Sequence, residues 1–120
     1  MMKISCVILN YNDPDTTIEQ ILGVRDYACF EYIAVVDNCS TDDSVERLTP
    51  YLTDKVILVR GEKNGGYGAG NNLGLRCSYE KLGMTHSVIA NPDTIFPERC
   101  VRSISRIFEK NQKVGVASAA

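Results

Sequence analysis

The chain has 120 residues, of which 44% are hydrophobic and 23% charged, and this is the size and composition of one globular domain. Its formal net charge of -2 gives no general attraction to nucleic acid or to an anionic membrane, so any bound phosphate must be held locally. No apolar stretch approaches the length of a transmembrane span, and the run Ile4–Leu9 is too short for a signal peptide and lacks a small-residue cleavage site after it, so we expect a cytoplasmic protein with at most peripheral membrane attachment.

The first half of the chain predicts two units of strand and helix. The apolar run Ile4–Leu9 indicates a strand buried on both faces, and Asp13 before Pro14 marks the start of a helix behind it. A second such strand, Ile33–Val36, is followed by a second helix. We place the start of that helix at Ser40, because an acid follows it at the spacing of a capping box.

The second half of the chain repeats this alternation. Strands are predicted at Val56–Val59 and Val88–Ala90, with a helix between them from about Ala69 to Leu82. A last helix opens after Pro97 and leads to a fifth strand, Val114–Ala117. The pattern predicts an α/β fold with a mainly parallel sheet and helices on both faces. Only three small residues follow the fifth strand, so we expect a domain truncated at its C-terminus.

Polar residues gather where the predicted strands end. In open parallel sheets, ligands bind at the carboxyl ends of the strands. The segments that follow the first four strands are all rich in Asn, Asp and Gly: they are 10–13, 37–42, 61–68 and 91–93. Turn formation alone accounts for any one of them, but the segments that precede the strands show no such clustering. The sequence therefore predicts a ligand site at this rim of the sheet.

Two acids at this rim suggest specific chemistry. Asp37 ends a strand, and its carboxylate can accept hydrogen bonds from a base N–H or from ribose hydroxyls. Asp93 is the best candidate for a Mg²⁺ or Mn²⁺ ligand, since hard cations bind carboxylates and are often shared with a diphosphate. Such an ion would neutralise charge on a departing diphosphate.

A glycine-rich stretch, 65–70, follows the third strand and would bring backbone close to a ligand while opening a helix towards it. It matches neither GxGxxG nor a P-loop, because Asn71 replaces the third glycine and no GK[ST] ending is present. For Asn71 and Asn72, ligand binding and local capping are equally open.

Four blocks of the chain resemble the family 2 glycosyltransferases, which use nucleotide sugars and have the Rossmann-like GT-A fold. They are Val7-Ile8-Leu9-Asn10-Tyr11-Asn12, Val35-Val36-Asp37-Asn38-Cys39-Ser40-Thr41-Asp42, Asn64-Gly65-Gly66-Tyr67-Gly68-Ala69-Gly70-Asn71-Asn72 and Asn91-Pro92-Asp93. The Asn-Tyr-Asn, Asp-Asn-x-Ser and Asn-Pro-Asp variants look most like rhamnosyltransferase-type members.

The resemblance implies roles for individual residues. Asp93 matches the last acid of the family's Asp-x-Asp metal motif, and Asn91 replaces the first, so both would lie beside the diphosphate and a divalent metal. Asn10, Tyr11 and Asn12 would lie against the base, and Asp37 would hydrogen-bond it. The other residues that would contact or flank the nucleotide are Asn38, Asn64, Gly65, Gly68, Asn71 and Asn72.

The resemblance also implies a reaction. Residues 1–120 would be the donor-binding part of an inverting glycosyltransferase that takes a UDP- or dTDP-sugar. The acceptor would be a glycan or a lipid-linked glycan in bacterial cell-surface polysaccharide synthesis. The general base and the acceptor-binding part are expected beyond residue 120, so the fragment alone should bind a nucleotide and transfer nothing.

Two alternatives stay open. A non-catalytic nucleotide-sugar-binding module would carry the same loops. A nucleotidyltransferase fits less well, because it would have a basic, glycine-rich loop after the first strand, where 10–15 contains no Lys, Arg or Gly.

Overall fold

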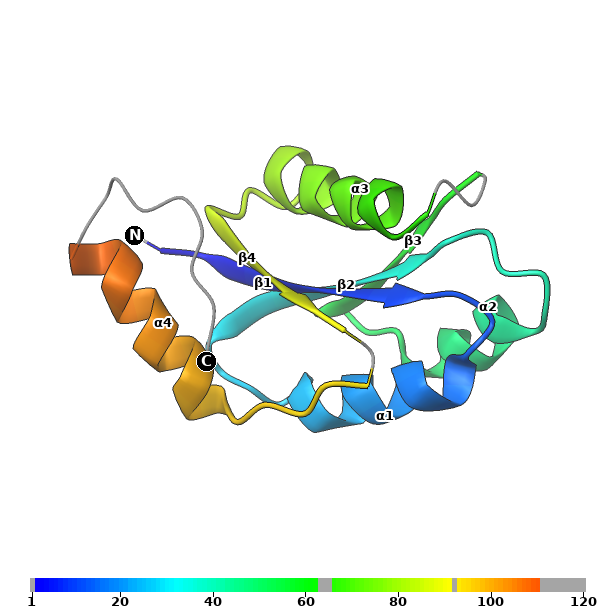
Figure 1. Cartoon of the computed structure of the whole chain (residues 1–120), viewed down its shortest axis with the longest axis horizontal. Helices are drawn as coiled ribbons and strands as arrows, with labels where there is room; N and C mark the ends of the chain where they lie inside the picture. The colour runs from blue at the N-terminus through cyan, green and yellow to red at the C-terminus, as the bar shows by residue number, and fades with distance from the viewer. Residues whose placement is uncertain (1, 63–65, 92, 111–120) are drawn as a thin grey trace.

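The computed structural model describes residues 2–62, 66–91 and 93–110 (Figure 1). The elements are β1 (Ile4–Asn10), α1 (Pro14–Val24), β2 (Phe30–Asp37), α2 (Ser44–Leu48), the 3₁₀ turn η1 (Thr49–Tyr51), β3 (Val56–Arg60), α3 (Tyr67–Glu80), β4 (His86–Ala90) and α4 (Glu98–Lys110). The four strands form one parallel sheet in the order β3-β2-β1-β4. The predicted α/β alternation is confirmed, while the expected fifth strand, Val114–Ala117, lies outside the described residues.

Helices cover both faces of the sheet because the strands are apolar on both faces. Cys6 and Ile8 of β1 belong to a buried cluster with Ile21 of α1, together with residues of α2 and α4. Val7 and Leu9, which alternate with them along β1, belong to a second cluster on the side of α3. Figure 1 shows α3 on one side of the sheet and α1 and α2 on the other. The prediction of a sheet buried on both faces is therefore confirmed.

Glycines let α3 lie very close to the sheet. A Cβ added at Gly74 would lie 2.5 Å from Cγ1 of Val7 and 2.8 Å from Cγ2 of Val36, and one added at Gly70 would lie 2.4 Å from Cδ1 of Leu9. Any larger residue at these two positions would push the helix away from β1 and β2. The predicted role of the stretch 65–70 in approaching a ligand therefore does not apply to Gly70, which faces the sheet.

The start of α2 differs from the prediction. The helix begins at Ser44 rather than behind Ser40, and a carboxylate oxygen of Asp42 accepts the backbone N–H of Ser44. The hydroxyl of Ser40 donates instead to Asp37 at the end of β2. The capping-box spacing was therefore misleading, because a nearby carboxylate competed for the hydroxyl.

In the part of the chain that the structure covers, no helix combines the length and the apolar character needed to cross a membrane.

Candidate functional site at the carboxyl rim of the sheet

The register of the sheet places the predicted segments at one rim. Asn10 of β1 pairs with Asp37 of β2, which pairs with Arg60 of β3. On the other side of β1, Ile8 pairs with Ala90, the last residue of β4. The chain adds strands outward from β1 to β3 and then returns to place β4 beside β1. Such a reversal of strand order opens a crevice at the carboxyl ends of the strands, where ligands bind in open α/β sheets.

Asn10 and Asp37 form the buried centre of this rim. Their side chains are 1% and 3% exposed, and Nδ2 of Asn10 donates to Oδ1 of Asp37 at 3.0 Å. The hydroxyl of Thr17, at the second turn of α1, donates to Oδ1 of Asn10 at 2.6 Å. The hydroxyl and the backbone N–H of Ser40 donate to Oδ1 and Oδ2 of Asp37 at 2.6 and 3.1 Å. These bonds tie the ends of β1 and β2 and the start of α1 into one unit.

Most acceptor positions of the Asp37 carboxylate are consequently occupied by donors of the protein itself. Oδ1 accepts from both Asn10 and Ser40, and Oδ2 accepts from the Ser40 backbone. A carboxylate offers about four lone-pair positions, so one position on Oδ2 remains for a further donor. The structure thus gives Asp37 a structural role that the sequence did not indicate, besides any contact with a ligand.

Asn12 joins the loop after β1 to the loop after β2. Its Oδ1 accepts the backbone N–H groups of Thr41 and Asp42 at 2.8 and 3.3 Å, and its Nδ2 donates to the hydroxyl of Thr41 at 3.1 Å. Asn12 and Cys39 both have positive φ values, 51° and 60°, and asparagine tolerates this left-handed region better than most residues. The side chain of Asn12 therefore holds the loop that carries Ser40.

Tyr11 differs from its neighbours because its side chain is open to solvent. It is 45% exposed and lies between two residues whose polar groups are engaged within the rim, Asn10 and Asn12. Of these three predicted nucleotide-binding residues, Tyr11 is thus the one whose side chain is presented outward.

The segment after β4 forms a turn that exposes an acid. The backbone N–H of Thr94 donates to the carbonyl of Asn91 at 2.9 Å, which is the bond that closes a β-turn. Asn91 and Asp93 are both exposed. Among the described residues, no group of three or more His, Cys, Asp and Glu side chains is placed to hold a metal ion. Asp93 therefore offers a single carboxylate, and any ion there would take its other ligands from a bound phosphate and water.

The remaining predicted residues lie around the start of α3. Nδ2 of Asn38 donates to the carbonyl of Gly66 at 3.2 Å, which joins β2 to the start of the helix. Gly68 and Asn72 are exposed and Asn71 is buried. Asn64 and Gly65 lie outside the described residues.

The sequence did not indicate Thr17, Ser40 or the joining role of Asn12. Thr17 follows Asn10 by seven residues and lies on the buried side of α1. Once that helix is predicted, a buried hydroxyl this close to the end of a strand indicates a possible hydrogen-bond partner for the strand's last residues. For Ser40 the signal was present but was assigned to helix capping.

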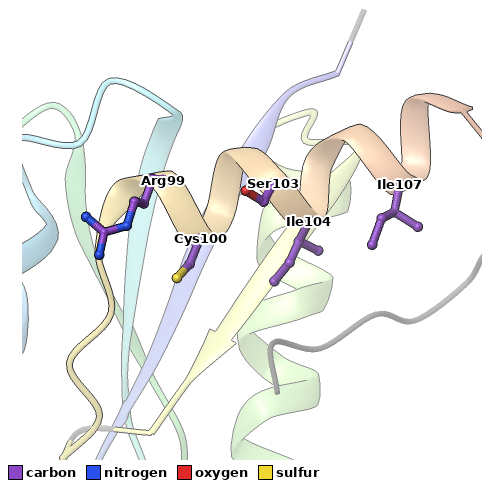
Figure 2. A pocket seen from close by; sticks show the side chains of 5 residues that line it. All are labelled: Arg99, Cys100, Ser103, Ile104 and Ile107. Atoms are coloured by element: carbon purple, nitrogen blue, oxygen red, sulfur yellow. The ribbon is translucent and has the colours of Figure 1, made fainter.

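A shallow hollow on α4 is lined by Arg99, Cys100, Ser103, Ile104 and Ile107 (Figure 2). All five residues come from one helix, and in Figure 1 α4 lies on the left whereas β1 and β2 end on the right. This hollow therefore holds none of the predicted site residues, and we place the site at the rim.

Comparison with known proteins decides the family. The sequence model described as Glycosyl transferase family 2 matches residues 5–119. The chain belongs to this family. The low-salt glycan biosynthesis hexosyltransferase Agl10 of Haloferax volcanii is 27% identical over 109 residues, which are 88% of this chain and 33% of that protein. The chain thus spans about one third of the length of the curated relatives that it matches.

Solved structures share the fold. The mannosyltransferase PcManGT from Pyrobaculum calidifontis, in complex with GDP-Man and Mn²⁺, has a TM-score of 0.70 at 20% identity over 94% of this chain and 34% of its own. TarS 1–349 of S. aureus in complex with UDP has a TM-score of 0.63 at 21% identity over 98% of this chain and 38% of its own. The expected GT-A fold is confirmed.

Proposed function

We propose that this chain binds the donor substrate of an inverting glycosyltransferase, a UDP- or dTDP-sugar, and that the whole enzyme transfers the sugar to a glycan or lipid-linked acceptor. Residues 1–120 would be the donor-binding part, with the general base and the acceptor-binding part elsewhere. The observation that carries this proposal is the convergence of the predicted residues at one rim, with Asn10 paired to Asp37 and the exposed Asp93 following β4. Agl10, named a hexosyltransferase of glycan biosynthesis, supports the reaction class.

The base would lie at the β1–β2 side of the rim. The exposed ring of Tyr11 offers an apolar face for stacking, and the unused position on Oδ2 of Asp37 can accept a base N–H. Asn10 and Asn12 would act by holding the rim in place, because their side chains are bonded to Asp37 and to the backbone of the loop after β2. This revises the direct base contact that the resemblance implied for these two asparagines.

The diphosphate would lie at the β4 side, beside Asn91 and Asp93. The exposed carboxylate of Asp93 suits Mg²⁺ or Mn²⁺, ions that bind one or two carboxylates and complete their shell with phosphate and water. When bound, such an ion would neutralise the charge that develops on the leaving diphosphate. The complexes of PcManGT with GDP-Man and Mn²⁺ and of TarS with UDP support nucleotide and metal binding here.

The same proposal includes the subclass of the enzyme and its location in the cell. The Asn-Tyr-Asn and Asn-Pro-Asp variants support a rhamnosyltransferase-like member that acts in polysaccharide synthesis. All five cysteines are free thiols, which supports a cytoplasmic location because thiols stay reduced there. Any membrane association would then be peripheral.

Titration calorimetry tests the proposal. UDP and dTDP, each with and without Mn²⁺, are titrated into the native chain and into Tyr11→Ala, Asp93→Ala and Tyr79→Ala. Tyr79→Ala is the matched control, since its ring is 75% exposed near the far end of α3. We expect Tyr11→Ala to weaken binding about tenfold under all conditions, as loss of base stacking costs roughly 1–3 kcal/mol. Asp93→Ala should remove only the gain in affinity due to Mn²⁺.

Two results would contradict the assignment. Unchanged affinity in both Tyr11→Ala and Asp93→Ala would mean that the nucleotide binds elsewhere. Sugar transfer by the 120-residue chain in a turnover assay would show that a general base lies within it.

A further inference from the structure

Asn71 is an unusual polar residue within α3. It is only 6% exposed, yet its Oδ1 has no hydrogen-bond partner among the described residues. Buried amide oxygens are almost always paired, because an unpaired one loses its hydration without compensation. An unpaired oxygen beside a ligand site therefore indicates that a hydrogen-bond donor of the ligand is its partner.

The position of Asn71 follows from the helix geometry. Ser78 lies two turns further along α3 and so on the same face. The hydroxyl of Ser78 accepts from Ser5 of β1 at 2.8 Å, and Ser5 in turn shares a hydrogen bond of 2.8 Å with Ser87 of β4. This face of α3 therefore lies over β1 and β4.

Asn71 lies at the rim end of that face. Its neighbour Gly70 lies against Leu9, near the carboxyl end of β1, and Gly66 at the start of α3 accepts from Asn38. Asn71 consequently lies above the end of β1 on the side of β4, which is where the strand order reverses and the crevice opens. In the proposed binding mode this is between the base at Tyr11 and the diphosphate at Asp93.

The chemistry of Oδ1 restricts what it can bind. An amide oxygen accepts and does not donate. A phosphate oxygen without a proton would be repelled by it, whereas a hydroxyl can donate to it.

We propose that Oδ1 of Asn71 accepts a hydrogen bond from a hydroxyl of the bound nucleotide sugar, on the ribose or on the transferred sugar, and that Asn71 is thereby a specificity-determining residue. The inference rests on the proposed donor site and adds a hydroxyl contact from α3 to it.

The test compares two buried side-chain amides, each with one atom that lacks a hydrogen-bond partner among the described residues. In Asn71→Leu the acceptor is replaced by an apolar group of similar size. Gln20→Leu is the matched control, since Gln20 is 5% exposed, lies in the middle of α1 and has an Nε2 without a partner in the part of the chain that the structure describes. Both variants and the native chain are titrated with UDP, 2′-deoxy-UDP, 3′-deoxy-UDP and UDP-glucose, and thermal unfolding is measured without ligand. Asn71→Ala, which suits a helix, is made alongside in case the leucine is not accommodated.

We expect the Asn71 variants to bind about three- to tenfold more weakly, the effect of one neutral hydrogen bond, and Gln20→Leu to bind normally. A ribose hydroxyl is the partner if the loss with UDP disappears for one deoxy analogue. A hydroxyl of the transferred sugar is the partner if the loss appears only with UDP-glucose.

One result would overturn the inference while leaving the donor site intact: native affinity of the Asn71 variants for all four ligands. If these variants also unfold at a lower temperature than Gln20→Leu, the amide of Asn71 has a structural role instead. If the native chain binds none of the ligands, the donor site itself is wrong and this inference falls with it.

Discussion

The two sides of the rim are built differently. At the ends of β1 and β2, Asn10 and Asp37 are buried and bonded to each other and to Thr17 and Ser40. After β4, Asp93 is exposed and Ile95, two residues later, is 97% exposed. One acid is thus part of a closed network and the other is open to solvent, although both follow strands of the same sheet.

This difference separates two tasks of a donor site. A network that is complete without a ligand is ordered before binding, so that binding loses less conformational freedom. An exposed carboxylate leaves its lone pairs for a cation and costs little to keep solvated. We therefore expect changes on the β1–β2 side to affect stability first, and changes on the β4 side to affect ligand binding alone.

The largest expected difference in stability is between the alanine variants of the two acids, Asp37 and Asp93. Asp37→Ala removes the carboxylate that accepts from the amide of Asn10 and from the hydroxyl and backbone N–H of Ser40, and we expect a loss of about 2–4 kcal/mol in the free energy of unfolding. Asp93→Ala should change it by less than about 0.5 kcal/mol, since surface substitutions away from packed features rarely do more. Urea unfolding of both variants measures the difference.

Asp37→Asn serves as the control, because it keeps one oxygen acceptor and the side-chain volume. It should lose less stability than the alanine variant. Equal stability of Asp37→Ala and Asp93→Ala would show that the buried network contributes nothing and would remove the contrast between the two sides.

A second test concerns α3, which covers both sides of the rim. Gly74→Ala would place a methyl group 2.5 Å from a methyl group of Val7, and we expect a loss of about 1–3 kcal/mol from this overpacking. Gly68→Ala adds its methyl group in open space and should gain up to about 1 kcal/mol from helix propensity. The unfolding temperatures of the two variants should therefore move in opposite directions.

Gly68→Ala also tests the predicted nucleotide contact at this glycine. A variant that is more stable than the native chain but binds UDP more weakly would support close approach of the ligand to Gly68. If Gly74→Ala is also more stable, α3 has room above β1 and does not pack closely against it.

Much of the fold followed from local pattern. The runs of Val and Ile gave the four strands of the described sheet, and Asp13 before Pro14 gave the first residue of α1, where the side chain of Asp13 accepts the N–H of Thr16. The strand order could not be read locally, because the position of β4 beside β1 depends on which strands pair across the whole sheet.

The rim was predictable, but its internal bonds were not. That 10–13, 37–42 and 91–93 meet at one edge follows from parallel strands alone. Whether Asp37 faces a ligand or Ser40 depends on the loop that contains Cys39, which has a positive φ. A cysteine at this position does not predict such a backbone conformation. The packing role of Gly70 and Gly74 could not be predicted either, because only the packed helix shows that they face β1.

The smallest expected effect concerns the side chain that joins the two loops. Asn12→Ala removes the hydrogen bonds of the Asn12 side chain to Thr41 and Asp42 and places a β-carbon without a compensating polar group at φ 51°, so we expect a loss of about 1 kcal/mol. Asn12→Gly removes the same bonds but accepts the positive φ, and should lose less stability. If the β1–β2 side is ordered before binding, both variants should bind UDP more weakly by a similar factor, because both release the loop that carries Ser40. Weaker binding by the alanine variant alone would instead assign the effect to backbone strain, and the hydrogen bonds of Asn12 would then not be what orders the rim.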